Sequence, residues 1–159
     1  MQTVKKRLLL LATHLAALAA GFALGVYLLP ILTAPPAPTA GELAAQAAAA
    51  QFSGHFRRDL KDSDALHWGE GKVSVGPRSI VLEGQLAPGP DYKLYLSPEF
   101  VETEADFLRL KPRMARVGDV KTFRNFAVAV PDGIDPAAFT TAVVWCETFG
   151  QFITAARYR

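Results

Sequence analysis

The chain begins with one long apolar run and continues with short runs in which apolar and polar residues alternate. The apolar run extends from Leu8 to Leu29, and no acidic or basic residue lies between Arg7 and Glu42. Its 22 residues are enough, as a helix, to cross a hydrocarbon layer of about 30 Å. Pro30 is expected to end the helix, because proline cannot donate the hydrogen bond that continues it. We therefore predict a transmembrane helix over residues 8–29.

The rest of the chain shows a period of two, which is typical of β-strands with one buried face. The alternating runs are 73–75, 80–82, 92–97 and 126–130, and Gly/Pro/Asp turn signals separate them at 76–77, 88–91, 131–133 and 135–136. Residues 142–146 are apolar on both faces and are expected to form a central strand. Short strands between turn signals predict an all-β domain, an antiparallel β-sandwich or barrel.

One segment departs from the strand pattern. Ser97 followed by Pro98 is a helix-start pair, and Lys111-Pro112 is a stop signal, so one or two helical turns are expected between them. The apolar residues that could line one face of this helical excursion are Phe100, Phe107, Leu108 and Leu110.

These patterns divide the chain into four parts. Residues 1–7 are an N-terminal tail, 8–29 the transmembrane span, 30–51 a Pro- and Ala-rich tether, and 52–159 one β domain. The proline-rich half of the tether should be extended, and its alanine-rich half could form a short helix. No large residue in the tether is expected to nucleate a core.

The distribution of charge predicts the orientation of the span. Lys5, Lys6 and Arg7 precede it, and no Lys or Arg follows until Arg57. Cationic flanks stay in the cytoplasm, so the chain is predicted to be a single-pass cell-membrane protein whose C-terminal domain is periplasmic or extracellular. A signal anchor is favoured over a cleaved signal peptide, whose apolar core is usually about 7–15 residues, although small-residue cleavage sites occur at 32–34 and 38–40.

The net charge of the exported part argues against nucleic-acid binding. The whole chain carries 17 Lys and Arg against 15 Asp and Glu, but three of the cations lie in the N-terminal tail. From Leu8 onward the balance is 14 against 15, so no basic surface of the kind that binds phosphate backbones is expected.

Small residues recur on one stripe of the predicted span. Thr13, Ala17, Gly21 and Gly25 are spaced by four, and the last two form a GxxxG motif. Such a stripe lets two helices approach closely, which favours a homodimer through Ala17, Gly21 and Gly25. The alternative interpretation is that alanine and glycine are simply common in such spans.

The sequence contains no complete catalytic or metal-binding motif. Gly69–Lys72 resembles part of a phosphate loop, but Leu66 and Val73 replace the glycine and the Ser/Thr that the motif needs. The acids between His55 and His67 have no standard metal-ligand spacing. We therefore expect no metal, no cofactor of the chain's own, and no stand-alone catalytic activity.

Several short motifs occur in an order that resembles a known family. They are Phe52–Phe56, His67–Val73, Gly89–Ser97, Val117–Phe123, the strand end at Val130-Pro131, and Val143–Cys146 followed by Phe149. This order resembles the DM-thirteen domain, an exported electron-transfer module that occurs beside haem-binding DOMON domains. The resemblance implies a β-sandwich in which Cys146 is the suspected redox residue, with His67 as its recurrent histidine. It also implies that any haem belongs to a partner protein.

Cys146 is the only cysteine, and two interpretations of it remain open. In the first, it is a redox thiol, with His67 as a weak candidate partner, and the domain is an electron-transfer accessory that acts on an envelope protein, either a haem or a redox protein. In the second, it is a core residue, since free cysteines often pack as small hydrophobes. The domain is then a non-catalytic envelope-protein-binding module.

Overall fold

The computed structural model describes residues 2–159, and its first element is a long, exposed helix, α1 (Gln2–Thr33). This helix is long and apolar enough to cross a membrane. The prediction that Pro30 ends it is wrong, because the helix continues to Thr33, whose hydroxyl donates to the Leu29 carbonyl at 2.8 Å. It ends where Ala34 precedes Pro35, since a residue before proline disfavours the helical conformation.

The predicted antiparallel sandwich is confirmed. One sheet has the order β1 (Phe52–Phe56), β2 (Gly69–Val75), β3 (Ser79–Leu86) and β6 (Arg124–Ala129). The other has the order β5 (Ala115–Val120), β4 (Tyr92–Ser97), β7 (Thr141–Cys146) and β8 (Gln151–Arg157). The described strand pairs are antiparallel, and β7 lies between β4 and β8, as its two-sided apolar pattern predicts.

The main core lies between the two sheets. The inward residues follow the alternation read from the sequence: Val73, Val75, Ile80, Leu82, Tyr92, Leu94, Leu96, Phe126 and Val128 belong to one buried cluster. Burial of this set removes a large apolar area from water, which is the dominant favourable contribution to folding.

A second core lies on the outer face of the β5-β4-β7-β8 sheet, under α3 (Glu104–Leu110). Phe107 stacks on Trp145 with ring centroids 3.9 Å apart. The helix begins at its N-cap Thr103, later than predicted, and it ends with a short 3-10 turn, η1 (Lys111–Arg113). The expectation that Leu108 joins the buried face is wrong, because Leu108 is 60 % exposed.

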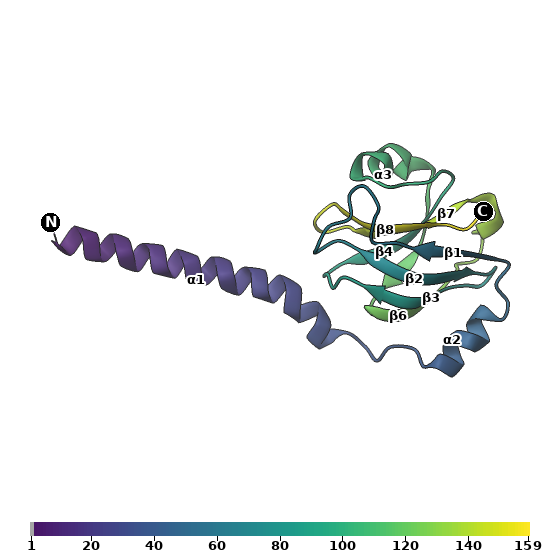
Figure 1. The fold of residues 1–159 in the computed structure, drawn as a ribbon, viewed down its shortest axis with the longest axis horizontal. Helices are drawn as coiled ribbons and strands as arrows, with labels where there is room; N and C mark the ends of the chain where they lie inside the picture. The colour runs from purple at the N-terminus through teal and green to yellow at the C-terminus, as the bar shows by residue number, and fades with distance from the viewer. Residues whose placement is uncertain (1) are drawn as a thin grey trace.

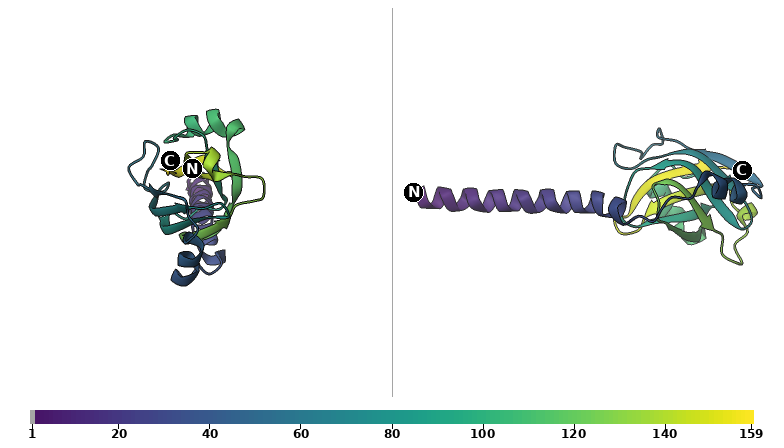
Figure 2. Two further views of the ribbon diagram at one scale, coloured as in Figure 1. Left: turned by 90° about the vertical axis from the view of Figure 1, so that its right-hand side faces the viewer. Right: turned by 90° about the horizontal axis from the view of Figure 1, so that it is seen from below.

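The alanine-rich half of the tether is a helix that packs on the domain. α2 (Ala40–Ala47) starts with a capping box between Thr39 and Glu42 and buries Leu43 to 2 % exposure. It lies against β3 and β6, and the Ser79 hydroxyl donates to the Gln46 carbonyl. The expectation that no large residue of the tether joins a core is wrong, because Leu43 packs on the outer face of the β1-β2-β3-β6 sheet. Figure 2 shows α2 and α3 on opposite sides of the sandwich.

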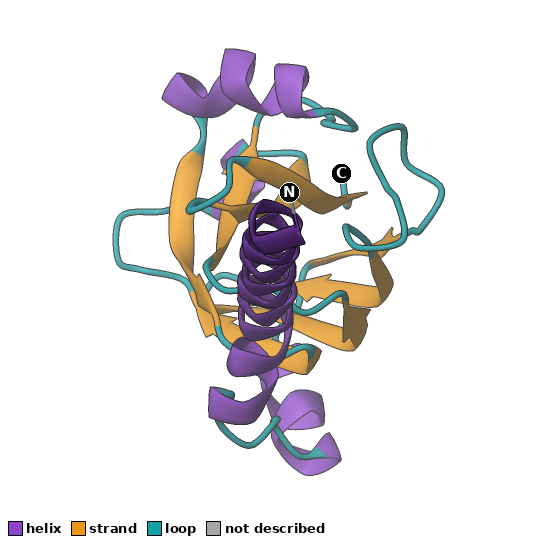
Figure 3. Cartoon of the chain, turned by 90° about the vertical axis from the view of Figure 1, so that its left-hand side faces the viewer, coloured by secondary structure: helices purple, strands orange, loops and turns teal. Residues whose placement is uncertain are grey.

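All loops at one end of the sandwich lie near α1. These are residues 57–68, 87–91, 121–123 and 147–150, and this end of the domain is called the α1 end below (Figure 1). Figure 3 looks along α1 onto this end. The opposite end carries the loop between β6 and β7, with its 3-10 turn η2 (Pro136–Ala138), and the C-terminus.

Candidate functional site at the α1 end

Cys146 is the last residue of β7 and lies at the α1 end. Its backbone is in register with Tyr92 of β4 and with Gln151 of β8. Its side chain is in the core between the sheets, whereas the neighbouring Trp145 belongs to the core under α3. The alternation predicted for this strand is confirmed, and Cys146 is a free thiol that is only 3 % exposed.

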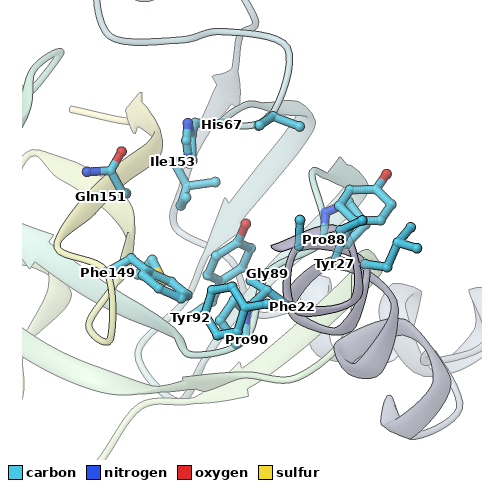
Figure 4. Close-up of a pocket in the computed structure, with 16 residues that line it drawn as sticks. Phe22, Tyr27, His67, Pro88, Gly89, Pro90, Tyr92, Phe149, Gln151 and Ile153 are labelled. Carbon is cyan, nitrogen blue, oxygen red and sulfur yellow. The ribbon is translucent and has the colours of Figure 1, made fainter. Parts of the chain in front are cut away.

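The thiol borders an apolar cavity of about 930 Å³, which the domain forms together with α1. Phe22 and Tyr27 come from α1, whereas His67, Tyr92 and Phe149 come from the domain (Figure 4). This space is called the apolar cavity below. A cavity of this size is in the range that holds a small molecule or a lipid chain, and its lining is mostly hydrophobic.

The surroundings of Cys146 favour the neutral thiol. Burial raises the pKa of Cys146 above its usual value, and backbone hydrogen bonds, chiefly from Phe149, oppose this rise only in part. Because the thiolate is the nucleophile, the resting thiol reacts slowly at neutral pH. A redox role for Cys146 therefore requires access through the apolar cavity or a local opening.

Tyr92 lines the apolar cavity beside Cys146. Its ring is 3 % exposed and packs edge-on against Phe123 at 5.9 Å between centroids. Burial raises the pKa of Tyr92, with a smaller contribution from Cys146. A Cβ at position 89 would collide with the ring and hydroxyl of Tyr92, so Gly89 is required for this close approach.

The structure places His67 at the same cavity but gives it another partner. The Nδ1 atom of His67 lies 3.0 Å from Oδ2 of Asp64, and Asp64 also accepts backbone hydrogen bonds from Leu66 and His67. The hydrogen bond with His67 is the main cause that lowers the pKa of Asp64; burial opposes it, and the backbone hydrogen bonds add smaller lowering contributions. Within residues 2–159 no hydrogen bond joins His67 to Cys146.

A smaller, polar crevice of about 220 Å³ lies beside the C-terminal end of α1. Pro30 and Thr33 line it from the helix, and Lys93 and Lys121 from the domain. Lys93 is held between two carboxylates, at 2.7 Å from Asp91 and 3.0 Å from Asp119.

No metal site is formed by the part of the chain that the structure describes. Nowhere in residues 2–159 do three His, Cys, Asp or Glu side chains come together as ligands. The acids near His67 form a loop instead, in which Asp59 pairs with Arg57 and Asp64 with His67.

The family model described as Electron transfer DM13 matches residues 56–158, well over half of the chain and nearly all of the domain. The chain belongs to this family. The match covers the sandwich from the end of β1 to the end of β8, including Cys146, His67 and Tyr92, and it confirms the resemblance read from the sequence. Comparisons with curated proteins and with solved structures give no match.

Sequence reasoning identified the thiol of this DM13 domain but not its surroundings. Tyr92 was assigned only as a strand residue, and Phe149 only as part of a motif. The signal that could have pointed to the cavity is the pair of large apolar residues on turns, Leu66 and Phe149, which remain 60 % and 47 % exposed. The α1 residues that close the cavity could not be assigned, because no sequence pattern links a span to a loop.

Proposed function

We propose that the protein is a membrane-anchored electron-transfer accessory whose redox residue is Cys146. α1 anchors the chain as a signal anchor, residues 1–7 lie in the cytoplasm, and the DM13 domain lies on the periplasmic or extracellular side. The length and apolar character of α1 and its cationic N-terminal flank support this arrangement. The family assignment supports the electron-transfer role.

The observation that carries the proposal is the position of the thiol at a cavity beside the anchor. Cys146 ends a central strand, and its side chain borders the apolar cavity that α1 helps to line. A partner therefore meets the thiol close to the membrane. The partner is an envelope redox protein, and any haem in the complex is the partner's.

A single cysteine limits the chemistry to exchange with a second protein. Cys146 loses its proton, and its sulfur attacks a disulfide of the partner. A mixed disulfide forms as the partner's S–S bond breaks, and the leaving sulfur takes up a proton, so the oxidation of the Cys146 sulfur is matched by the reduction of that one partner sulfur. A second thiol, supplied by the partner, then attacks the mixed disulfide and releases Cys146 as a thiol. The raised pKa of Cys146 keeps this reaction slow until the partner relieves its burial.

The test is the oxidation state of Cys146 in native membranes. Cells are quenched in acid, free thiols are alkylated under denaturing conditions, and the peptide with Cys146 is quantified by mass spectrometry. A fraction in mixed disulfide that rises with an oxidant and falls with a reductant is expected. Co-purification with a haem partner would add a Soret band to the absorption spectrum. A thiol that stays fully reduced under every condition would overturn the redox assignment.

One observation favours a second function. Cys146 is 3 % exposed, it packs in the main core, and its pKa is raised, as expected for a structural residue. The alternative is thus a membrane-tethered module that binds another envelope protein without redox chemistry. It predicts that a Cys146→Ala chain retains its partner in pull-downs and its function in the cell.

A further inference from the structure

The large apolar side chains that the domain leaves exposed are concentrated near α1. Within residues 52–159 they are Leu66, Leu108 and Phe149, and the first and last of these line the apolar cavity at the α1 end. Pro88 and Pro90 extend the same apolar rim. A contiguous exposed apolar surface on a folded domain marks a site that meets another apolar phase or molecule.

The depth of α1 at this cavity indicates which phase that is. Residues 20–27 of α1 line the cavity, and all of them lie within the apolar run 8–29. At a rise of 1.5 Å per residue, they lie about 3–14 Å inside the outer end of the run. Whatever surrounds the anchor at this depth also meets Leu66 and Phe149.

The next few residues of α1 meet a polar surface instead. Pro30 and Thr33 lie beside the polar crevice with Lys93 and Lys121, and Lys121 forms no ion pair among the described residues. The domain therefore changes from apolar to polar along the last turns of α1, where Ile31 and Leu32 are the final large apolar residues of the helix. A bilayer has the same order, hydrocarbon and then headgroups, and lysines are favourable beside anionic headgroups.

We propose that the α1 end of the domain rests in the outer bilayer–water interface, with Leu66 and Phe149 among the lipid chains and lipid hydrocarbon in the apolar cavity. This inference rests on the proposed function, in which α1 spans the membrane. The polar crevice holds Lys93 and Lys121 at headgroup level, which limits how far the domain enters the lipid chains. Cys146 then faces a space that is reached from the lipid side.

The experiment measures depth in liposomes that contain the full-length chain. Single cysteines for an environment-sensitive fluorophore replace Leu15, Leu66 or Leu108 in a Cys146→Ala background. The three side chains are matched in exposure, at 57 %, 60 % and 60 %, and lie in α1, at the cavity rim and on α3. Lipids with a nitroxide on the acyl chain quench a fluorophore that touches hydrocarbon.

We expect strong quenching at positions 15 and 66 and none at 108. Adding Phe149→Asp should abolish quenching at position 66 and leave position 15 unchanged. Quenching at 15 without quenching at 66 would overturn the docking but keep the anchor. Loss of quenching at 15 would show that the anchoring itself is wrong.

A second measurement avoids the Cys146→Ala background, in case that variant does not fold. Trp68 lies next to His67 on the same loop, under the guanidinium of Arg58, whereas Trp145 is buried under α3. Brominated lipids should quench part of the intrinsic fluorescence of the otherwise native chain. They should quench nothing in a Trp68→Phe variant. Equal fluorescence with and without bromine in the native chain would overturn the proposal.

Discussion

Replacing Cys146 by serine tests whether the thiol environment is as apolar as the structure indicates. The side chain is 3 % exposed between two sheets, and its neighbours on the same face of β7 are Ala142 and Val144. A hydroxyl placed there keeps the backbone hydrogen bonds that reach the thiol, chiefly from Phe149, and a buried hydroxyl whose hydrogen bonds are incomplete costs about 1–3 kcal/mol. Cys146→Ala buries no polar group and loses only an atom comparable to a methylene, which costs about 0.8 kcal/mol.

The assay is thermal unfolding of the full-length chain in detergent, followed by circular dichroism. For a domain of this size each kcal/mol shifts the midpoint by about 4–8 °C, so Cys146→Ser should melt on the order of 4–20 °C below the native chain. The melting temperature of Cys146→Ala should lie between those of the native chain and Cys146→Ser. A serine variant as stable as the native chain, or more stable than the alanine variant, would refute the assignment of an apolar thiol site.

Three further predictions follow from the packing. Leu43→Ala should cost about 2–5 kcal/mol in unfolding measurements, since α2 buries this side chain, whereas the exposed Leu108→Ala should change stability by less than about 0.5 kcal/mol. Gly89→Ala should displace the Tyr92 ring and lower the melting temperature, and a lost edge-on contact would appear in the near-ultraviolet circular dichroism. Because the pKa of Cys146 is higher in the folded than in the unfolded chain, the unfolded chain loses this proton first, and the melting temperature of the native chain should fall more steeply above about pH 8.5 than that of Cys146→Ala.

The sequence was sufficient for the strands that alternate and for the sandwich they form. Residues 73–75, 80–82 and 92–97 show one apolar face, and each lies in a strand whose inward side chains were assigned correctly. β8 was not predicted, because residues 152–156 are buried on both faces and so lack a period of two. A strand covered on one side by α3 and on the other by a sheet has no polar face to read.

Tertiary contacts explain the predictions that were wrong. Leu43 appeared to lie in a tether because its neighbours are alanines, and only the sheet surface beneath α2 gives it a place to be buried. Leu108 appeared to belong to a helix face, but the buried face of α3 is formed by Phe107 and Leu110, three residues apart, and Leu108 lies off this face. Pro30 was expected to stop α1, yet a proline removes one hydrogen bond and crowds one carbonyl of the preceding turn, and the helix continues for three residues beyond it.

The surroundings of the candidate site also depend on tertiary contacts that the sequence does not reveal. The family motifs identified Cys146 and His67 from the sequence, and both line the apolar cavity. The two residues are 79 positions apart, so the sequence did not show how they would lie relative to each other. It also gave no sign that the Nδ1 atom of His67 would be hydrogen-bonded to Asp64, three residues earlier. The cavity itself depends on loops from both sheets and on α1, and such a surface is defined only once the chain is folded.

The measurement that tests the account most directly is alkylation of Cys146 in the full-length chain in sealed liposomes, with the domain outside. Two maleimides are compared, one charged and confined to water, the other lipid-soluble, with mass spectrometry as the readout. We predict that the lipid-soluble reagent modifies Cys146 without denaturant, whereas the charged one does not. Phe149→Asp should reduce this difference. If both reagents react only after denaturant is added, Cys146 is a core residue, and the proposal of a redox thiol reached from the membrane side is contradicted.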